Sequence, residues 1–316
     1  MAVAATAISG SAFLGYAFMD PCIIARVNRL DTPPPGSPGY LTSLLSASTA
    51  EQLRNMIYYD PVLAALMLRS ANSTPYGSRE SVCNLSEAVS LIGVERVKAL
   101  CVKMFLCSSL SAEETMKRTE RERLWKNAYA TGILASRMVI HRPWLSKEQA
   151  YLLGLLHDFG LIVRAFIDRK TYRSAMNLAT QRNVPEWVFE SQVGIPHTRI
   201  GGMISTRWGF PKVLREVMEF HHDPVRSSDS RPEVMLIALA SVLANSGKFS
   251  DYVNDDLALE WRRRLYFTEE EWGRICSELA EVWYRVDQFW NLLNPGEVPN
   301  EGQVSGWDPA TLPWAD

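Results

Sequence analysis

The sequence predicts an all-α protein, because helix-start signals recur along the chain while strand signals are scarce. In a capping box, Ser or Thr and a Glu or Gln three residues later satisfy backbone N–H groups that the first turn of a helix leaves unpaired. Four pairs have this spacing: Ser48 with Glu51, Ser111 with Glu114, Ser146 with Gln149, and Thr268 with Glu271. Between these starts, apolar residues recur mostly at steps of three and four, as helices with one buried stripe require.

The composition excludes several classes of protein. Of the 316 residues, 47% are hydrophobic, which is enough for the core of one large domain or two small ones and argues against overall disorder. The 33 basic and 35 acidic residues leave a formal charge of -2. Nucleic-acid-binding proteins usually carry an excess of positive charge, which this chain lacks, so we expect no nucleic-acid partner.

Cysteine usage and hydropathy indicate a cytoplasmic protein. The five cysteines form no CxxC pair and no disulfide-like framework, which fits a reducing compartment. The mildly apolar tract Thr6–Met19 is followed by its first basic residue only at Arg26 and is interrupted by Ser and Gly, so we predict no signal peptide. No later uncharged apolar run approaches the ~20 residues that a bilayer requires, and we predict no membrane span.

Proline and glycine indicate how the chain is divided. The stretch Asp31–Gly39 cannot continue a helix, because proline lacks the N–H donor and clashes with the preceding turn. We therefore predict an N-terminal extension with a proline-rich linker at 1–39, a helical domain at 40–295 and an irregular tail at 296–316. A polar segment, Ser246–Asp256, marks a further boundary within the helical domain.

The last helix is predicted to run without interruption from about Glu269 to Leu293. A wide apolar face is formed along it by Trp272, Cys276, Leu279, Trp283, Val286 and Trp290. Docking of this face on the core is favoured over a partner-binding role, because apolar faces of this kind are mostly internal.

The sharpest local feature is His157-Asp158, near the end of the apolar segment Ala150–Val163. Apolar neighbours on every side predict a deeply buried helix, in which an imidazole and a carboxylate are costly unless they are paired or bind a cation. Two readings remain open. The pair satisfies itself and nearby backbone groups, or it belongs to a metal site, since both donors suit a divalent transition ion.

Three of the other histidines lie where ligands from separate helices could converge. His197 and His221 each share a helical face with apolar residues and are predicted to point inward. His222 lies about 100° round the helix from His221, where it either joins the site or interacts with the C-terminal end of the helix dipole. His141, beside Arg142 and Pro143, is predicted to lie on the surface.

Several motifs spread over residues 40 to 295 match one known family. These motifs are Asp60–Ser73 with its Asp-Pro start and Ala-Asn-Ser end, Tyr76-Gly77, Leu85–Gly93, Trp125, Leu155–Gly160, His197, Trp208–Pro211 and His221–Pro224. The chain resembles the HDOD domains, which are bacterial signalling relatives of HD-type metal-dependent phosphohydrolases. The resemblance implies an HD-domain-like multi-helical bundle with an N-terminal helical part at 40–115 and an HD-like part at 116–295.

Three departures from the pattern of the active relatives bear on function. The resemblance implies that a leading histidine ligand is replaced by Asn127, and that a closing aspartate ligand is replaced by Ser241. An amide oxygen binds a transition metal far more weakly than an imidazole, and a neutral hydroxyl does not balance metal charge. The lysine that resembles a phosphate contact in active relatives is Leu161 here.

A basic group downstream of this position could in principle replace the lost phosphate contact. It consists of Arg164, Arg169, Lys170 and Arg173. With only Asp168 among them, these residues are more simply read as a solvated helix end and loop.

The leading hypothesis is a non-catalytic HDOD signalling module that acts through protein contacts, with a degraded metal site made of His157, Asp158, His197, His221 and His222. Hydrolysis needs a metal-bound water and charge stabilisation together, and the three departures weaken both. We expect no cofactor other than a divalent transition metal ion at partial occupancy. The alternatives are a metal-dependent phosphohydrolase or nucleotide phosphodiesterase, and a sensor that binds a nucleotide second messenger without turnover.

Overall fold

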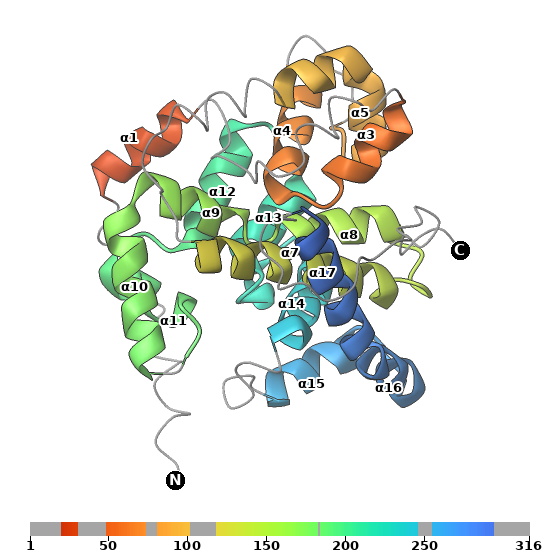
Figure 1. Cartoon of the computed structure of the whole chain (residues 1–316). Coiled ribbons are helices and arrows are strands. Elements are labelled where there is room, and N and C mark those ends of the chain that lie inside the picture. The colour runs from red at the N-terminus through yellow and green to blue at the C-terminus, as the bar shows by residue number, and fades with distance from the viewer. Residues whose placement is uncertain are drawn as a thin grey trace.

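A computed structural model describes residues 20–30, 49–73, 81–101, 118–182, 184–245 and 255–293 of the chain. Within these ranges every regular element is a helix and none is a strand, which confirms the all-α prediction (Figure 1). The α-helices of the first half are α1 Pro21–Arg29, α3 Ala50–Ile57, α4 Pro61–Ala71, α5 Leu85–Ile92, α7 Arg118–Met138 and α8 Lys147–Leu156. Those that follow are α9 Phe159–Ile167, α10 Arg169–Arg182, α11 Trp187–Val193, α12 His197–Arg207, α13 Lys212–Phe220, α14 Arg231–Asn245, α15 Asp255–Arg264, α16 Glu269–Ser277 and α17 Leu279–Leu293.

Side chains at the helix starts explain where several elements begin. The predicted capping boxes at Ser146 with Gln149 and at Thr268 with Glu271 are both confirmed, each with its two reciprocal hydrogen bonds. The first predicted box is wrong by one residue, because Thr49 and Gln52 make these bonds at the start of α3. The Ser111 box lies outside the described residues, as do the Asp31–Gly39 linker, the tail and most of the 246–256 boundary.

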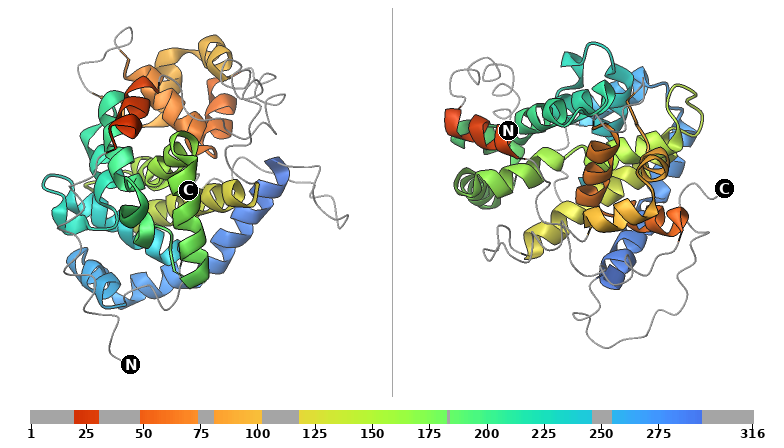
Figure 2. Two further views of the ribbon diagram at one scale, coloured as in Figure 1. Left: turned by 90° about the vertical axis from the view of Figure 1, so that its left-hand side faces the viewer. Right: turned by 90° about the horizontal axis from the view of Figure 1, so that it is seen from above.

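The centre of the fold is a set of helices that pack around α7 and α8 (Figures 1 and 2). Helix α14 packs on α7, while α12 packs on both α9 and α13, and α13 touches α8. Helices α3, α4 and α5 form a group of their own that meets the centre through α7 and α8, and α17 lies along α7. Buried apolar residues of the described chain, from Ile23 on α1 to Trp290 on α17, therefore belong to one main core cluster.

Buried aromatic rings join the N-terminal group to the centre. The Tyr151 hydroxyl on α8 donates a 2.7 Å hydrogen bond to the carbonyl oxygen of Tyr58 at the end of α3. The ring of the neighbouring Tyr59 lies 3.7 Å, between centroids, from the ring of Phe289 on α17, and Trp125 on α7 stacks on Phe289 at 5.8 Å. Helices from both ends of the described chain thus share one aromatic cluster.

The helix α1 packs on the body through α9 and α12. The backbone carbonyl of Leu30 accepts hydrogen bonds from the Trp208 indole at 3.0 Å and from the Arg207 guanidinium at 3.4 Å. Arg26 donates to the backbone carbonyl of Ile167 at 2.5 Å. The residues just before the proline-rich stretch are therefore part of the packed structure.

The C-terminal helix predicted to be continuous is interrupted at Glu278, between α16 and α17. Arg137 on α7 forms a 2.7 Å ion pair with Glu278, which holds the junction against the body. The break changes the helical phase, so Ile275 is buried where Cys276 was expected, and Cys276 is exposed. Beyond the break, Val286 and Trp290 are buried as expected, and the face docks on the core.

The predicted helix across Ala150–Val163 is also interrupted, because a turn at residues 157 and 158 separates α8 from α9. The whole stretch Lys147–Ile167 is long and apolar enough to cross a membrane, but 83% of its apolar window is buried inside the fold. It is an internal segment of the helical core, and the turn in its middle places His157 and Asp158 among the neighbouring helices.

The close approach of α9 to α12 depends on glycine. A Cβ atom at Gly160 would lie 2.1 Å from the carbonyl oxygen of His197 and 2.7 Å from the backbone nitrogen of Gly201. No side chain fits at such distances without moving the two helices apart. Gly160 therefore fixes the distance between Asp158, at the start of α9, and His197, at the start of α12.

We expect Gly160→Ala to lower the free energy of unfolding by about 1–3 kcal/mol, because the methyl group must push α12 away. Gly273→Ala is the matched control, since a Cβ atom at Gly273 on α16 meets nothing within 4 Å. That control should stabilise the protein by about 0.4–1 kcal/mol through reduced chain entropy in the unfolded state. Urea unfolding measures both, and a Gly160→Ala protein as stable as wild type would show that the α9–α12 contact is not fixed.

Candidate metal centre

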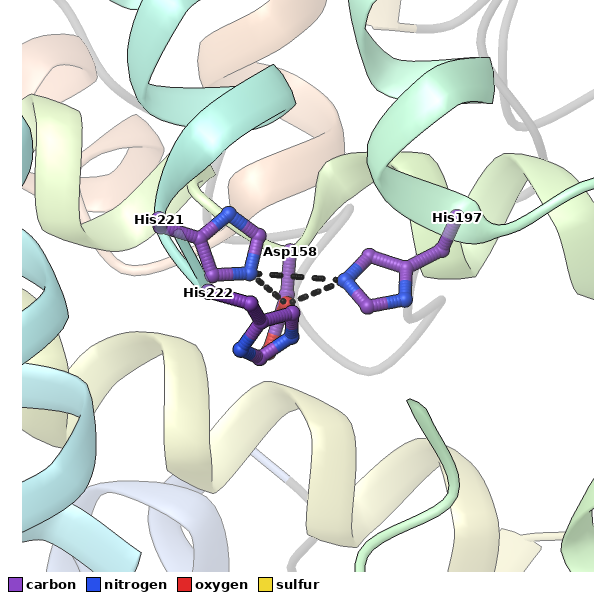
Figure 3. Close-up of side chains that lie close together, drawn as sticks. All are labelled: Asp158, His197, His221 and His222. Carbon is purple, nitrogen blue, oxygen red and sulfur yellow. Dashed lines mark hydrogen bonds and ion pairs between the residues drawn. The ribbon is translucent and has the colours of Figure 1, made fainter. Parts of the chain in front are cut away.

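The ends of three helical segments meet at one point in the core (Figure 3). Asp158 lies in the turn between α8 and α9, His197 is the first residue of α12, and His221 and His222 follow directly after α13. His221 is the C-cap of α13, and its ring is buried with only 1% exposed. Because helix ends can be brought together without breaking backbone hydrogen bonds, four side chains distant in sequence converge here.

The distances among these side chains are short. Oδ1 of Asp158 lies 3.3 Å from Nε2 of His197 and 3.2 Å from Nε2 of His221, and the two Nε2 atoms are 3.4 Å apart. With His222, the four residues each offer one ligand atom, and these atoms all lie within 4.8 Å of one another. The predicted inward orientation of His197 and His221 is seen in this arrangement, and His222 joins it.

The outer nitrogens of the rings determine which tautomers are present. Nδ1 of His197 lies 2.6 Å from a carboxylate oxygen of Glu190, and Nδ1 of His221 lies 3.0 Å from the carbonyl oxygen of Val217. Both partners can only accept, so both Nδ1 atoms carry a proton and donate it. In the neutral rings the Nε2 lone pairs therefore point at each other and at Asp158 Oδ1.

The two oxygens of Asp158 have different surroundings. On the Oδ2 side, Asn127 Nδ2 lies 3.4 Å from the carboxylate, and the Ser241 hydroxyl lies 3.2 Å from Nε2 of His157. His157 itself lies 3.0 Å from Oδ2 and donates through Nδ1 to the carbonyl oxygen of Gly154 at 2.7 Å. On this side the Asn127 amide donates to Oδ2 of Asp158, and the Ser241 hydroxyl donates to Nε2 of His157.

The Oδ1 side has acceptors and no such donors. Two imidazole Nε2 atoms and a carboxylate oxygen converge there, and the buried Nε2 of His222 has no hydrogen-bond partner within the described structure. Converging acceptors repel one another unless a cation lies between them. Three imidazole nitrogens and one carboxylate oxygen are donors that suit zinc, iron, manganese or nickel, so the residues fit one divalent transition ion.

A proton is the alternative occupant, and the ionisation of the site reflects it. Burial alone would lower the pKa of His197, but the charge of Glu190 and the hydrogen bonds to Asp158 and Glu190 raise it to about 10. Burial alone would raise the pKa of Asp158, but the charge of His157 and hydrogen bonds from three histidines hold it well below its usual value. Burial keeps the pKa of His222 well below the usual value, so this ring stays neutral.

A buried ion pair between Glu190 and Arg164 lies on the Nδ1 side of His197. The sequence analysis did not predict it. Glu190 on α11 is 1% exposed, and its second carboxylate oxygen lies 2.6 Å from Nη1 of Arg164, which is fully buried on α9. The expectation that Arg164 lies in a solvated helix end is therefore wrong. Its position within the otherwise uncharged run Phe159–Ile167 was the available signal, because an arginine there must find a buried partner. Glu190 carried no comparable signal.

The other predicted positions are placed as follows. Leu161 is 2% exposed and packs with Leu124 and Tyr172 in a small apolar cluster, so it presents no charge to the centre. Lys170 and Arg173 are exposed on α10, and His141 is exposed as predicted. Asn127 and Ser241 both lie beside the His157-Asp158 pair, each 8% exposed.

The chain matches a known family over more than half of its length. A family model for the HDOD domain matches residues 43–224. The chain belongs to the HDOD domain family. The match includes the turn at Asp158, His197 and the His221-His222 pair, so the HDOD region contains all four residues of the candidate centre.

Solved structures and a curated relative resemble this HDOD chain. It is similar to the MmoQ response regulator of Methylococcus capsulatus str. Bath, with a TM-score of 0.61 and 21% identity, covering 78% of this chain and 98% of that one. A virulence factor of Campylobacter jejuni subsp. jejuni gives a TM-score of 0.63 at 17% identity, covering 80% and 95%. An uncharacterized protein of Treponema pallidum (strain Nichols) is 26% identical over 196 residues, 59% of this chain and 36% of the relative, so the chain spans about a third of that relative.

The proton at His197 predicts how metal binding depends on pH. The pKa of about 10 means that the ring is protonated at pH 7 in the metal-free protein. An arriving ion must displace this proton, so each ion bound releases about one proton, and the affinity rises about tenfold per pH unit between pH 6 and 8. Calorimetric titration with Zn²⁺ in two buffers of different ionisation enthalpy measures the release. An affinity that does not change with pH would show that no proton competes for the position.

Proposed function

We propose that this chain is a cytoplasmic, non-catalytic HDOD regulatory module that works through protein contacts and holds a single divalent transition ion. The carrying observation is the asymmetry around Asp158. Asn127 and Ser241 serve its Oδ2 side with neutral hydrogen-bond donors, while the Oδ1 side presents three imidazoles and a carboxylate oxygen. The first side has neutral donors beside it, whereas the second gathers the ligand atoms that a divalent ion could bind.

The lack of turnover follows from what surrounds the ion. Phosphodiester hydrolysis needs a metal-activated water and positive groups that stabilise the phosphoryl charge in the transition state. Three histidines and one aspartate would take up most of the coordination shell of a single ion. Leu161 faces an apolar cluster, and Arg164 is already paired with Glu190. Neither position offers a cation to a substrate phosphate.

A signalling role is supported by the family and by one structural relative. The chain has the HDOD domain over residues 43–224, and its fold resembles that of a protein described as a response regulator. A module without turnover affects its pathway by binding, so we propose a protein partner. A nucleotide second messenger is a further candidate ligand.

A metal-dependent phosphohydrolase or phosphodiesterase is the second candidate function. The observation that favours it is the survival of four clustered ligands, with Asp158 still 17% exposed at its side chain. A single ion with one open position can activate a water molecule. The two functions differ in whether turnover accompanies metal binding.

The test compares metal content and turnover in three proteins. Wild type should bind about one Mn²⁺ or Zn²⁺ per chain and show no hydrolysis of bis(p-nitrophenyl) phosphate above the background of His157→Ala, Asp158→Ala. The variant Asn127→His, Ser241→Asp should bind about two ions, because both neutral positions become ligands. Elemental analysis and release of p-nitrophenol are the two measurements.

Metal-dependent hydrolysis by wild type that disappears in the His157→Ala, Asp158→Ala protein would establish the second candidate instead. Thermal stabilisation of wild type by a cyclic dinucleotide, without product, would favour the nucleotide-sensing alternative, since a ligand that binds the native state raises its stability. A wild type that takes up no ion under any of these conditions would contradict the metal-binding part of the proposal.

A further inference from the structure

The short helix α11 contacts two of the four candidate ligands. Glu190 on α11 binds His197, and Trp187, the first residue of α11, stacks on His222 with ring centroids 4.7 Å apart and planes at 22°. Trp187 is 38% exposed, whereas His197 is 2% exposed. One surface helix therefore touches the buried centre at two points.

Three short contacts hold the buried carboxylate of Glu190, two of them hydrogen bonds and one an ion pair. Oε2 accepts from Nδ1 of His197 at 2.6 Å and from the backbone nitrogen of the same residue at 2.8 Å, and Oε1 pairs with Arg164 at 2.6 Å. A carboxylate bound to the outer nitrogen of a metal-binding histidine fixes the tautomer and the ring plane. Glu190 thus aims Nε2 of His197 at Asp158.

Trp187 orients the ring of His222, as Glu190 orients the ring of His197. No hydrogen bond within the described structure fixes the Nε2 atom of His222, so ring contacts restrict the plane of the ring. The rings of His221 and His197 lie 4.1 and 5.2 Å from it between centroids, and the Trp187 indole is the contact that reaches the surface. Rotation of His222 toward an ion must therefore alter the stacking with Trp187, whose indole is accessible to solvent.

We propose that Glu190 and Trp187 are positioning residues for the metal centre, and that α11 carries the presence or absence of the ion to the protein surface. The inference rests on the metal site of the proposed function. It goes beyond that function by naming α11 as the helix that responds to the ion and Trp187 as the exposed side chain that changes.

A purely structural role for α11 is separable from this one. Glu186, the N-cap of α11, forms a 2.8 Å ion pair with Arg123 on α7 and contacts none of the four ligands in the described structure. Glu186→Gln weakens the attachment of α11 to the body, and Glu190→Gln weakens the orientation of His197. The first is the matched control for the second.

The experiment measures Zn²⁺ affinity in the full chain. Glu190→Gln should bind Zn²⁺ about 10–100-fold more weakly than wild type, which is the usual effect of removing a carboxylate behind a metal-binding histidine. Glu186→Gln should keep the wild-type affinity. Equal affinity for Glu190→Gln and wild type, with wild type binding Zn²⁺, would overturn the inference and leave the metal site intact.

Trp187 provides a second readout that does not require Glu190→Gln to fold. Zn²⁺ does not quench indole by itself, so we expect its addition to change the fluorescence of wild type through His222, and this change to disappear in Trp187→Phe. Trp144→Phe is the control, because Trp144 is 42% exposed and lies before α8, at the far end from Asp158. A change that persists in Trp187→Phe would overturn the role of α11, and a wild type that binds no Zn²⁺ would overturn both proposals.

Discussion

The structure around the candidate centre depends on the largely buried carboxylate of Asp158, whose side chain is 17% exposed. A carboxylate in a helical core is stable only if hydrogens or cations surround it, and here the turn between α8 and α9 places it where three histidine Nε2 atoms lie within 3.0–3.3 Å. Gly160 makes this possible, because only a residue without a side chain lets α9 lie against the backbone of His197. The starts of α9 and α12 therefore provide both the close backbone packing and the contact between Asp158 and His197.

The two sides of this carboxylate differ in the chemistry of their neighbours. Where Asn127 and Ser241 stand, a neutral amide lies 3.4 Å from Asp158 Oδ2 and a neutral hydroxyl lies 3.2 Å from Nε2 of His157. Where His197 and His221 stand, both outer nitrogens donate hydrogen bonds, so in the neutral rings the inner nitrogens are acceptors. Substitutions at Asn127 and Ser241 would leave the contacts of His197 and His221 unchanged, because the hydrogen-bond and ion-pair partners of the two sides have only Asp158 in common.

The sequence was sufficient for the helical class and for the residues that face the centre, because periodicity and capping are local properties. His197 and His221 lie beside Asp158 as their helical faces predicted, and Asn127 and Ser241 lie beside the His157-Asp158 pair, where the resemblance to the HDOD domains implied them. The breaks at His157 and Glu278 were not predictable, since each is set by contacts with other helices such as the Arg137–Glu278 ion pair. The Arg164–Glu190 pair was missed for the same reason. Its partners are 26 residues apart, and only the fold shows that both are buried.

In the proposed metal site, the occupant of the centre would affect how strongly α11 is held. In the metal-free protein, His197 shares its second proton with Asp158 and is positively charged, so Glu190 faces one unit of charge from that ring and another from Arg164. If His197 held a divalent ion in place of this proton, the ring would be neutral, the charge between the ligands would be one unit higher, and the hydrogen bond from Nδ1 to Glu190 would be stronger. Glu190 therefore experiences a different field in each state. Because Trp187 on the same helix rests on His222, this difference extends from a buried charge to an exposed side chain within a single short helix.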